Sequence, residues 1–370
     1  MNSAHLTRHR SHPRVPRAFT LLELLVAASI TVVISGFFFA IVRNVGTTWT
    51  RASGRLGADA QARLVLDQLA LDLQGALFRD DGHVWFAADI LDTNGNSGLW
   101  VAAQTPNNAK PAGSTSLVLN SPSIADARFG LAGVWLRFFT TSRGTNTTAN
   151  PATISAPVAV GYQVVRRFTA TNPLNQNTAY LLHRAEVRPG AVSSRLGVLE
   201  SGYDLTAAAY TTGGANNDGS STGDPRSVQA PGTNAGTRNL DSIIADNVVD
   251  FGIRCYVRDA TQPGGLRLIF PASAAGVPGG TAATRLRSSL PSSVPAASGN
   301  ATSPFPDVVD VMIRVLTDDG AELIANLEKS PAQPPTRPQK YLNNAAWWWG
   351  VVQENSRVYT RRIVLRAQPL

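Results

Sequence analysis

The stretch FTLLELLVAASITVVISGFFFAIV, residues 19–42, determines how this chain of 370 residues is organised. Glu23 is its one ionisable side chain among 24 residues. A helix of that length rises about 36 Å at about 1.5 Å per residue, which is enough to cross a hydrocarbon layer of about 30 Å. The stretch therefore predicts a transmembrane helix.

The residues ahead of this helix form a basic leader. Residues 1–18 contain Arg8, Arg10, Arg14 and Arg17 and no acidic side chain. Positive charge before an apolar helix holds that end in the cytoplasm, so the rest of the chain should lie on the other side of the membrane. The apolar run is longer than the h-region of a secretory signal peptide, which has about 7–15 residues, and no small-residue cleavage site follows it.

Glu23 has two interpretations. A charged group at the centre of a bilayer costs about 2.5–3.5 kcal/mol on insertion scales, so its presence in an apolar helix needs a reason. Glu23 lies near the start of the helix and could be hydrated at the membrane surface. Alternatively, it has an oppositely charged partner, to which it would be attracted far more strongly in lipid than in water.

Residues 17–26, RAFTLLELLV, resemble the junction between leader and helix in type IV prepilins and type II secretion pseudopilins. That family has a small residue, usually Gly, followed by Phe-Thr-Leu-x-Glu and an apolar helix. The resemblance implies cleavage between Ala18 and Phe19 by a prepilin peptidase and methylation of the new Phe19 amine. It also implies that Glu23 pairs with the amino terminus of a neighbouring subunit in a filament. Ala18 departs from the family's usual Gly.

The sequence and this resemblance together imply an α+β fold. Residues 1–18 are the cleaved cytoplasmic leader, 19–42 the transmembrane helix, 43–79 its amphipathic continuation and 80–370 a β-rich head. The expected partners are other pilin-like subunits, the prepilin peptidase, the inner-membrane assembly platform and membrane lipid. The expected location is the inner membrane, crossed once, with the head in the periplasm or outside the cell in an assembled filament.

The amphipathic continuation rests on apolar residues spaced three and four apart. They are Val45, Trp49, Ala52 and Leu56, followed by Leu66, Leu69, Leu73 and Leu77. Gly46, Gly54 and Gly57 each weaken a helix by about 1 kcal/mol relative to Ala, which predicts a bend or a locally melted turn. Arg63 and Asp67 lie four residues apart and are expected to pair.

From about residue 80 the apolar period changes to two, which predicts half-buried antiparallel strands. The alternating sets are Val134, Leu136 and Phe138; Val158, Val160, Tyr162 and Val164; Val249, Phe251, Ile253, Cys255 and Val257; Val309, Val311, Ile313 and Val315; and Tyr359, Ile363 and Leu365. Cys255 is expected to be a buried core residue. Residues 205–240 and 271–306 are rich in Gly, Ser, Ala, Thr, Asn and Pro, and are expected to be mobile insertions in one domain.

A second resemblance covers the carboxy-terminal half. Residues 162–165, 181–184, 243–251, 305–311 and 359–366 are similar to segments of J-type minor pseudopilins and W-type minor pilins. These later segments are common strand patterns, and they do not separate a secretion pseudopilin from a pilus subunit.

Composition argues against several other functions. The formal net charge of +8 falls to +4 without the four leader arginines, and the remaining basic residues form no stripe, so no nucleic-acid binding is expected. Cys255 is the one cysteine, which excludes a disulfide framework. Residues 219–223 fit Gly-x-Ser-x-Gly but lack the strand and helix that this motif needs, and His183 is interpreted as a strand-edge residue. We therefore expect neither an enzyme nor a bound cofactor or metal.

Two further features of the sequence each have two possible interpretations. Residues 92–96, and residues 216–219 with Asp224, could supply oxygen ligands to calcium, although Asp, Asn and Gly are also typical of tight turns, which we favour. Trp347, Trp348 and Trp349 are interpreted as a buried cap over the sheet or as an anchor for another protein.

The sequence predicts a minor pilin or pseudopilin that joins a filament through its amino-terminal helix, at the tip or as an initiating subunit. A large head with long loops would obstruct dense helical packing, which favours such a role. The alternative is a periplasmic binding protein or enzyme that is tethered to the membrane by an uncleaved anchor.

Overall fold

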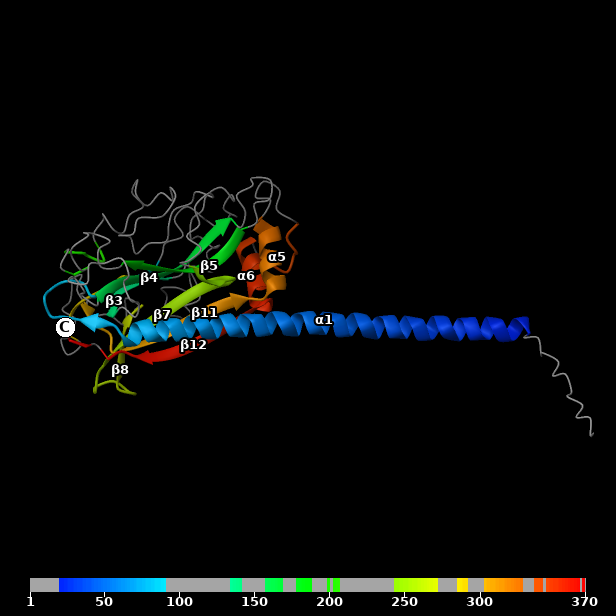
Figure 1. The fold of residues 1–370 in the computed structure, drawn as a ribbon, viewed down its shortest axis with the longest axis horizontal. Coiled ribbons are helices and arrows are strands. Elements are labelled where there is room, and N and C mark those ends of the chain that lie inside the picture. The colour runs from blue at the N-terminus through cyan, green and yellow to red at the C-terminus, as the bar shows by residue number, and fades with distance from the viewer. Residues whose placement is uncertain are drawn as a thin grey trace, which may run out of the picture. The chain divides into compact units, whose positions relative to one another are not determined.

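The computed structural model describes residues 20–90, 134–141, 157–168, 178–187, 198–199, 202–206, 243–271, 285–291, 303–328, 336–341, 344–366 and 368–369. The chain divides into two units with a boundary between Ser53 and Gly54. The described part of the first unit is the amino-terminal portion of helix α1. The second unit, which we call the head, contains the last turns of α1 and every strand that the structure describes (Figure 1).

Helix α1 spans Leu21–Gln74 without interruption. It is helical through Gly46, Gly54 and Gly57, so a melted turn is not present there, whereas a bend stays a prediction. The helix also ends before the expected residue 79. It stops at Gly75, where a Cβ atom would lie 2.8 Å from the Thr141 Oγ1 atom, too close for any residue but glycine without rearrangement.

The larger sheet has seven strands in the order β10-β9-β2-β3-β4-β5-β6. Their bounds are β2 Phe86–Ile90, β3 Val134–Thr141, β4 Pro157–Phe168, β5 Thr178–Val187, β6 Ile243–Asp246, β9 Arg285–Leu290 and β10 Ser303–Pro304. The pairs from β9 to β6 are antiparallel. Strand β3 is buried on both faces, not half-buried as its alternation predicts.

The smaller sheet has four antiparallel strands in the order β12-β11-β7-β8. Their bounds are β7 Val248–Arg258, β8 Leu266–Phe270, β11 Val308–Leu316 and β12 Ser356–Val364. A short parallel pair joins β1 (Leu77–Phe78) to β13 (Gln368–Pro369). The strands predicted from the five alternating sets are therefore confirmed, and so is the α+β class.

Asn247 connects the two sheets, because it is the single residue between β6 and β7. Its φ of 59° lies in the left-handed region, which Asn enters more readily than most residues. Its carbonyl oxygen accepts a hydrogen bond from the Leu316 N–H at 2.8 Å. The chain thus leaves one sheet and enters the other within a single residue.

Between the sheets and helix α1 lies one main hydrophobic core. The helix contributes Val65, Leu69 and Leu73, all with no exposed surface, and Cys255 of β7 is equally buried, as predicted. In Figure 1 the last turns of α1 lie beside β12, in agreement with the contacts of Asp59 and Asp67 with that strand. Asp67 pairs with Arg361, and not with Arg63 as the helical spacing predicts.

Two expectations about the head need correction. The segment 271–306, expected to be a loop insertion, contains strands β9 and β10. The head also has two helices that the β-rich pattern did not predict, α5 (Asp318–Glu328) and α6 (Asn344–Glu354). Helix α5 begins where the Thr317 Oγ1 atom accepts a hydrogen bond from the Gly320 N–H at 3.3 Å, as a helix cap does. Most of the other expected insertion, from residue 207 onward, lies outside the described residues.

Candidate functional site: the amino-terminal helix

Glu23 is held by the first turn of its own helix. The Thr20 N–H donates to the Glu23 Oε2 atom at 3.0 Å, and the Thr20 hydroxyl donates to the same oxygen at 3.1 Å. In return, the Glu23 N–H donates to the Thr20 Oγ1 atom at 3.2 Å. This reciprocal arrangement is a capping box, in which a Thr and a Glu three residues apart satisfy two free N–H groups. The structure thus adds a local role for Glu23 that the sequence interpretation missed.

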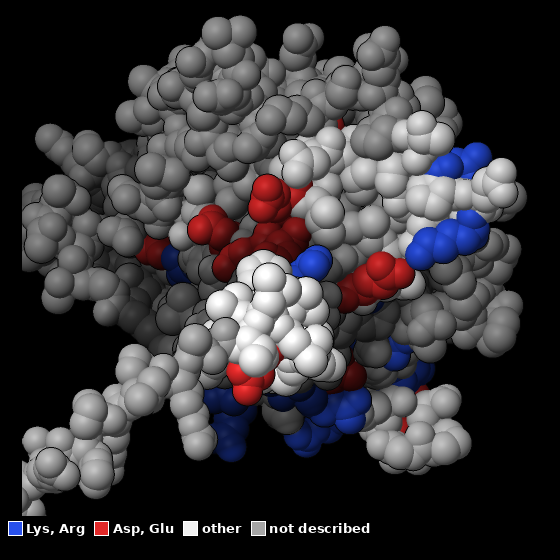
Figure 2. All heavy atoms as spheres, turned by 90° about the vertical axis from the view of Figure 1, so that its right-hand side faces the viewer, with Lys and Arg blue, Asp and Glu red and all other residues white. Residues whose placement is uncertain are grey.

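The turns that follow present apolar side chains on all sides. Leu21 is 83% exposed, Phe39 71% and Val45 61%, and in Figure 2 the end of α1 that faces the viewer is mostly white, with red at its lower edge. This is the one helix, within the described residues, that is long and apolar enough to cross a membrane. In water such a surface would be unfavourable by about 25 cal/mol per Å² of apolar area.

Two hydroxyl groups among these apolar turns donate to carbonyl oxygens of the helix itself. The Ser29 hydroxyl donates to the Val26 carbonyl oxygen and the Thr31 hydroxyl to the Ala27 carbonyl oxygen, both at 2.8 Å. A hydroxyl bonded to its own helix needs no water, so it is tolerated in hydrocarbon. The helix is therefore suited to lipid or to burial among other helices.

Two of the predicted site residues cannot be placed. Ala18 and Phe19, the expected positions of cleavage and methylation, lie outside the described residues. Both therefore remain predictions from the sequence.

A buried carboxylate, Asp72, joins the last turn of α1 to the larger sheet. Its side chain accepts hydrogen bonds from the Tyr162 hydroxyl, from the Arg184 Nε atom at 2.7 Å and from the Gln68 Nε2 atom at 3.2 Å. The Asp72 carbonyl oxygen accepts a further bond from the Thr140 hydroxyl at 2.7 Å. Strands β3, β4 and β5 thus all hold this one residue of the helix.

Arg184 supplies the positive charge of this cluster and lies between the carboxylates of Asp72 and Glu186. Burial of Arg184 disfavours its positive charge, but the hydrogen bonds to Asp72 and Glu186 and the charges of Tyr162 and Asp72 together outweigh burial and raise the pKa of Arg184 above its ordinary value. A second carboxylate, Glu186, also pairs with Arg184. Burial, and then the charge of Asp72, raise the pKa of Tyr162 well above its usual range, so its hydroxyl stays a proton donor. Such a satisfied network fixes the rotation and register of the helix on the sheet.

Strand β12 holds the same part of α1 from the smaller sheet. The Tyr359 hydroxyl bonds to Asp59, and Arg357 lies 3.4 Å from the same carboxylate. Burial and the bond to Asp59 raise the pKa of Tyr359 to about 12. Further along the helix, Arg361 pairs with Asp67. Both sheets therefore anchor the last turns of α1.

Three leucines are exposed on the outward face of these turns, together with Arg63 and Asp67. Leu56 is 68% exposed, Leu64 63% and Leu71 41%, whereas Val65, Leu69 and Leu73 are fully buried against the head. At 100° per residue the three exposed leucines fall within one narrow sector, nearly opposite the buried set. We call Leu56, Leu64 and Leu71 the outer stripe. Leu56 belongs to the apolar side that the sequence predicts for the amphipathic continuation, and such a side is expected to face the head; its exposure corrects that interpretation.

A second cluster of charge lies on strands β2, β3 and β9. Asp89 faces Arg137, Arg287 at 2.8 Å and Arg285 at 3.6 Å. Burial lowers the pKa of Arg137 to about 10, although Asp89 opposes this effect. The guanidinium of Arg137 also lies 3.7 Å from the centre of the Trp135 ring. This cluster joins three strands of the larger sheet.

Among the described residues, the remaining candidates form no second site. His183 is only 5% exposed and lies within β5, so its interpretation as a strand-edge residue is wrong. The possible calcium segments and the Gly-x-Ser-x-Gly motif lie outside the described residues. Within the described residues, no group of three or more His, Cys, Asp or Glu side chains is arranged to hold a metal ion.

The three tryptophans have different environments. Trp348 is fully buried, and its indole N–H donates to the Glu328 Oε1 atom at 2.9 Å. The same oxygen accepts the Tyr180 hydroxyl at 2.7 Å. Trp347 and Trp349 are half-buried beside it. Trp348 therefore fills the core between α6, α5 and β5, as the interpretation of a buried cap predicts.

Comparison with models of known protein families, with curated proteins and with solved structures gives no match to this chain.

Proposed function

We propose that this protein is a minor pilin or pseudopilin, a non-enzymatic subunit that joins a filament through helix α1. The observation that carries the proposal is that the two parts of this helix have different surroundings. One part is apolar on every side and begins with a single carboxylate, Glu23, whereas the last turns are held by both sheets of the head. A helix that served only as a tether would need no such double attachment.

The leader and the apolar turns support membrane insertion before assembly. The basic residues 1–18 would remain in the cytoplasm until a prepilin peptidase cuts between Ala18 and Phe19, and the head would lie in the periplasm. Other pilin-like subunits and the inner-membrane assembly platform would then replace lipid around the helix. Burial of the exposed apolar side chains against neighbouring helices would stabilise the filament.

Glu23 would pair with the methylated amine of a neighbouring Phe19. In the free subunit, both hydrogen bonds from Thr20 reach the same carboxylate oxygen, Oε2. A carboxylate has about four acceptor positions, so Glu23 can keep its capping bonds and still accept a charged amine. The pairing is strong in an apolar filament core because the effective dielectric constant there is low.

The outer stripe supports packing of the last turns of α1 as well. Leu56, Leu64 and Leu71 stand exposed opposite the face that the head covers. Exposed leucines at helical spacing suit an apolar groove between neighbouring helices. The head would then sit on the outside of the filament, which suits a tip or initiating subunit.

Two substitutions separate the pairing role of Glu23 from its capping role. Glu23→Gln keeps a capping box, because Gln serves at that position as Glu does, but it removes the charge. Glu23→Ala removes both. Under the proposal, both variants enter the membrane and neither is recovered in filaments. If Glu23→Gln assembles like the wild type and only Glu23→Ala fails, the capping box matters and the charge pairing does not.

The alternative function is a periplasmic binding protein or enzyme on an uncleaved anchor. Mass spectrometry of the protein purified from membranes distinguishes the two. A chain that begins at methyl-Phe19 supports the pilin proposal, whereas a chain that retains residues 1–18 supports the tether.

A further inference from the structure

Strand β12 forms one edge of the smaller sheet. It spans Ser356–Val364 and, among the strands that the structure describes, pairs with β11 alone. An edge strand of this length presents a row of backbone donors and acceptors on its open side. Natural sheets usually cover or interrupt such an edge.

The hydrogen bonds at the two ends of the pair show which residues face the open side. The Leu365 N–H donates to the Asp307 carbonyl at 2.8 Å, and the Thr317 N–H donates to the Asn355 carbonyl at 2.9 Å. Bonded and non-bonded pairs alternate along an antiparallel ladder. The odd-numbered residues of β12 therefore bond to β11, and Val358, Thr360, Arg362 and Val364 direct their backbone N–H and C=O groups outward.

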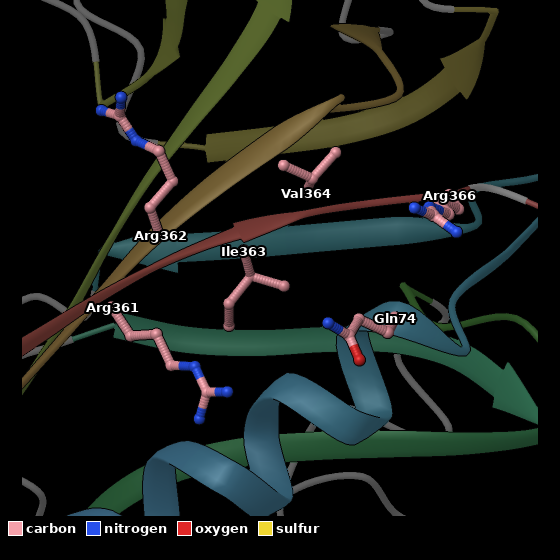
Figure 3. Close-up of a pocket in the computed structure, with 6 residues that line it drawn as sticks. All are labelled: Gln74, Arg361, Arg362, Ile363, Val364 and Arg366. Carbon is pink, nitrogen blue, oxygen red and sulfur yellow. The ribbon is translucent and has the colours of Figure 1, made fainter.

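A cavity of about 580 Å³ lies along this open side. It is lined by Gln74 at the end of α1, by the four consecutive β12 residues 361–364 and by Arg366. Figure 3 shows Arg361 and Ile363 on the side of helix α1, and Arg362 and Val364 directed to the other side of the strand. A cavity that touches four consecutive strand residues must lie at the edge of the strand, because neighbouring side chains point to opposite faces.

The lining of this cavity is basic. Among the described residues, the lining includes Arg361, Arg362 and Arg366 and no acidic side chain, and residues 356–366 contain four arginines and no Asp or Glu. Arg361 pairs with Asp67, and Arg362 with Asp310 at 2.7 and 2.8 Å. These ion pairs are partly exposed, and such pairs contribute only about 0.2–1 kcal/mol to stability. A carboxylate from another chain can therefore bind these arginines beside their present partners or in place of them.

We infer that the open edge of β12 binds an extended acidic segment of another protein by strand addition. The outward N–H and C=O groups would continue the ladder, and the acidic side chains on one face of the segment would meet Arg362, on the side of the strand away from α1, and Arg366 just beyond the end of the strand. Strand addition takes its affinity from main-chain bonds and its specificity from alternate side chains. The inference does not depend on a role in a filament, because it rests on the head alone.

A synthetic peptide of alternating Asp and Val, about eight residues long, is the probe, because strands of this size are common. Its binding to the full chain in detergent is followed by fluorescence anisotropy. Wild-type protein should bind the peptide, and should not bind its Lys-Val counterpart. Thr360→Pro removes one outward N–H and leaves the bonds to β11 intact, so binding should weaken by about tenfold or more.

Charge and backbone contributions are tested separately. Arg366→Glu should weaken binding about tenfold at low salt, whereas Lys340→Glu, which reverses an exposed charge elsewhere on the head, should leave it unchanged. An Asp-Val peptide with N-methyl groups on alternate residues keeps its charge but cannot continue the ladder. It should not bind, and this test does not depend on the folding of any variant.

Three outcomes would overturn the inference. The first is the absence of binding by the Asp-Val peptide. The second is equal binding of the N-methylated peptide, with displacement by inorganic phosphate, which would mean a simple anion site. The third is self-association of the chain that Thr360→Pro abolishes while the peptide does not compete, because the occupant would then be a second copy of this protein.

Discussion

The Asp72 carboxylate on helix α1 and the Arg184 guanidinium on strand β5 form a buried ion pair with a distance of 2.7 Å between Oδ2 and Nε. The two residues are 112 positions apart in the sequence. Tyr162 and Gln68 complete the hydrogen bonds of the carboxylate. The pair therefore determines where along the helix, and in which rotation, the head is attached.

Replacement of Asp72 should destabilise the head strongly. Asp72→Ala leaves the largely buried Arg184 with only Glu186 as an acidic partner, and removal of one member of a buried pair typically costs about 3–5 kcal/mol. Urea denaturation measures the change. Asp67→Ala is the matched control, because Asp67 pairs on the surface and should cost less than about 1 kcal/mol. Equal effects of the two substitutions would contradict the importance of the buried cluster.

Tyr359 should make the head less stable in alkali. Its pKa is raised to about 12 in the folded chain, whereas an unfolded tyrosine has a pKa of about 10. A raised pKa means that the Tyr359 hydroxyl keeps its proton to a higher pH in the folded state than in the unfolded state. The contribution of this hydroxyl to stability is therefore complete below pH 10 and is lost as the pH rises towards 12.

The variant Tyr359→Phe isolates this contribution. It should remove part of the decline in stability between about pH 10 and 12, and the absorbance titration should lose one phenol that ionises near pH 12. Identical curves of unfolding free energy against pH for the wild type and the variant over this range would show that the bond to Asp59 does not contribute to stability.

Trp348 should be the tryptophan on which stability depends. Trp348→Phe loses the bond to Glu328 and leaves a partly filled space in a fully buried site, for which about 2–4 kcal/mol is expected. Thermal unfolding measures the loss. Trp347→Phe, at a half-buried neighbouring position, should cost less than about 1 kcal/mol. A larger cost for Trp347 than for Trp348 would contradict the assignment of Trp348 to the core.

The outer stripe should affect assembly and leave folding unchanged. Leu64→Ser changes a side chain that is 63% exposed, so the free energy of unfolding should change by less than about 0.5 kcal/mol. The amount of protein in sheared filaments should nevertheless fall, because an apolar contact between subunits is lost. Leu69→Ala is the contrasting core variant and should cost about 2–5 kcal/mol. Normal recovery of the Leu64 variant in filaments would exclude the stripe from assembly.

The sequence alone was sufficient for the features that depend on local patterns. The length and hydrophobicity of residues 19–42 predict a helix able to cross a membrane, and the alternation of Val309 to Val315 predicts strand β11. Helix α5 could also have been predicted from the sequence, because Thr317 precedes two acidic residues and Ile324 and Leu327 repeat at helical spacing. Helix α6 carries no such polar and apolar pattern.

Only the tertiary structure decided which distant residues meet. Asp72 lies between buried leucines on the helix, but no local pattern indicates that Tyr162 and Arg184 will surround it. The open edge of β12 likewise follows from the order of strands in its sheet. Helical and strand periodicity are properties of neighbouring residues, whereas contacts between elements depend on how their registers and shapes fit when the core closes.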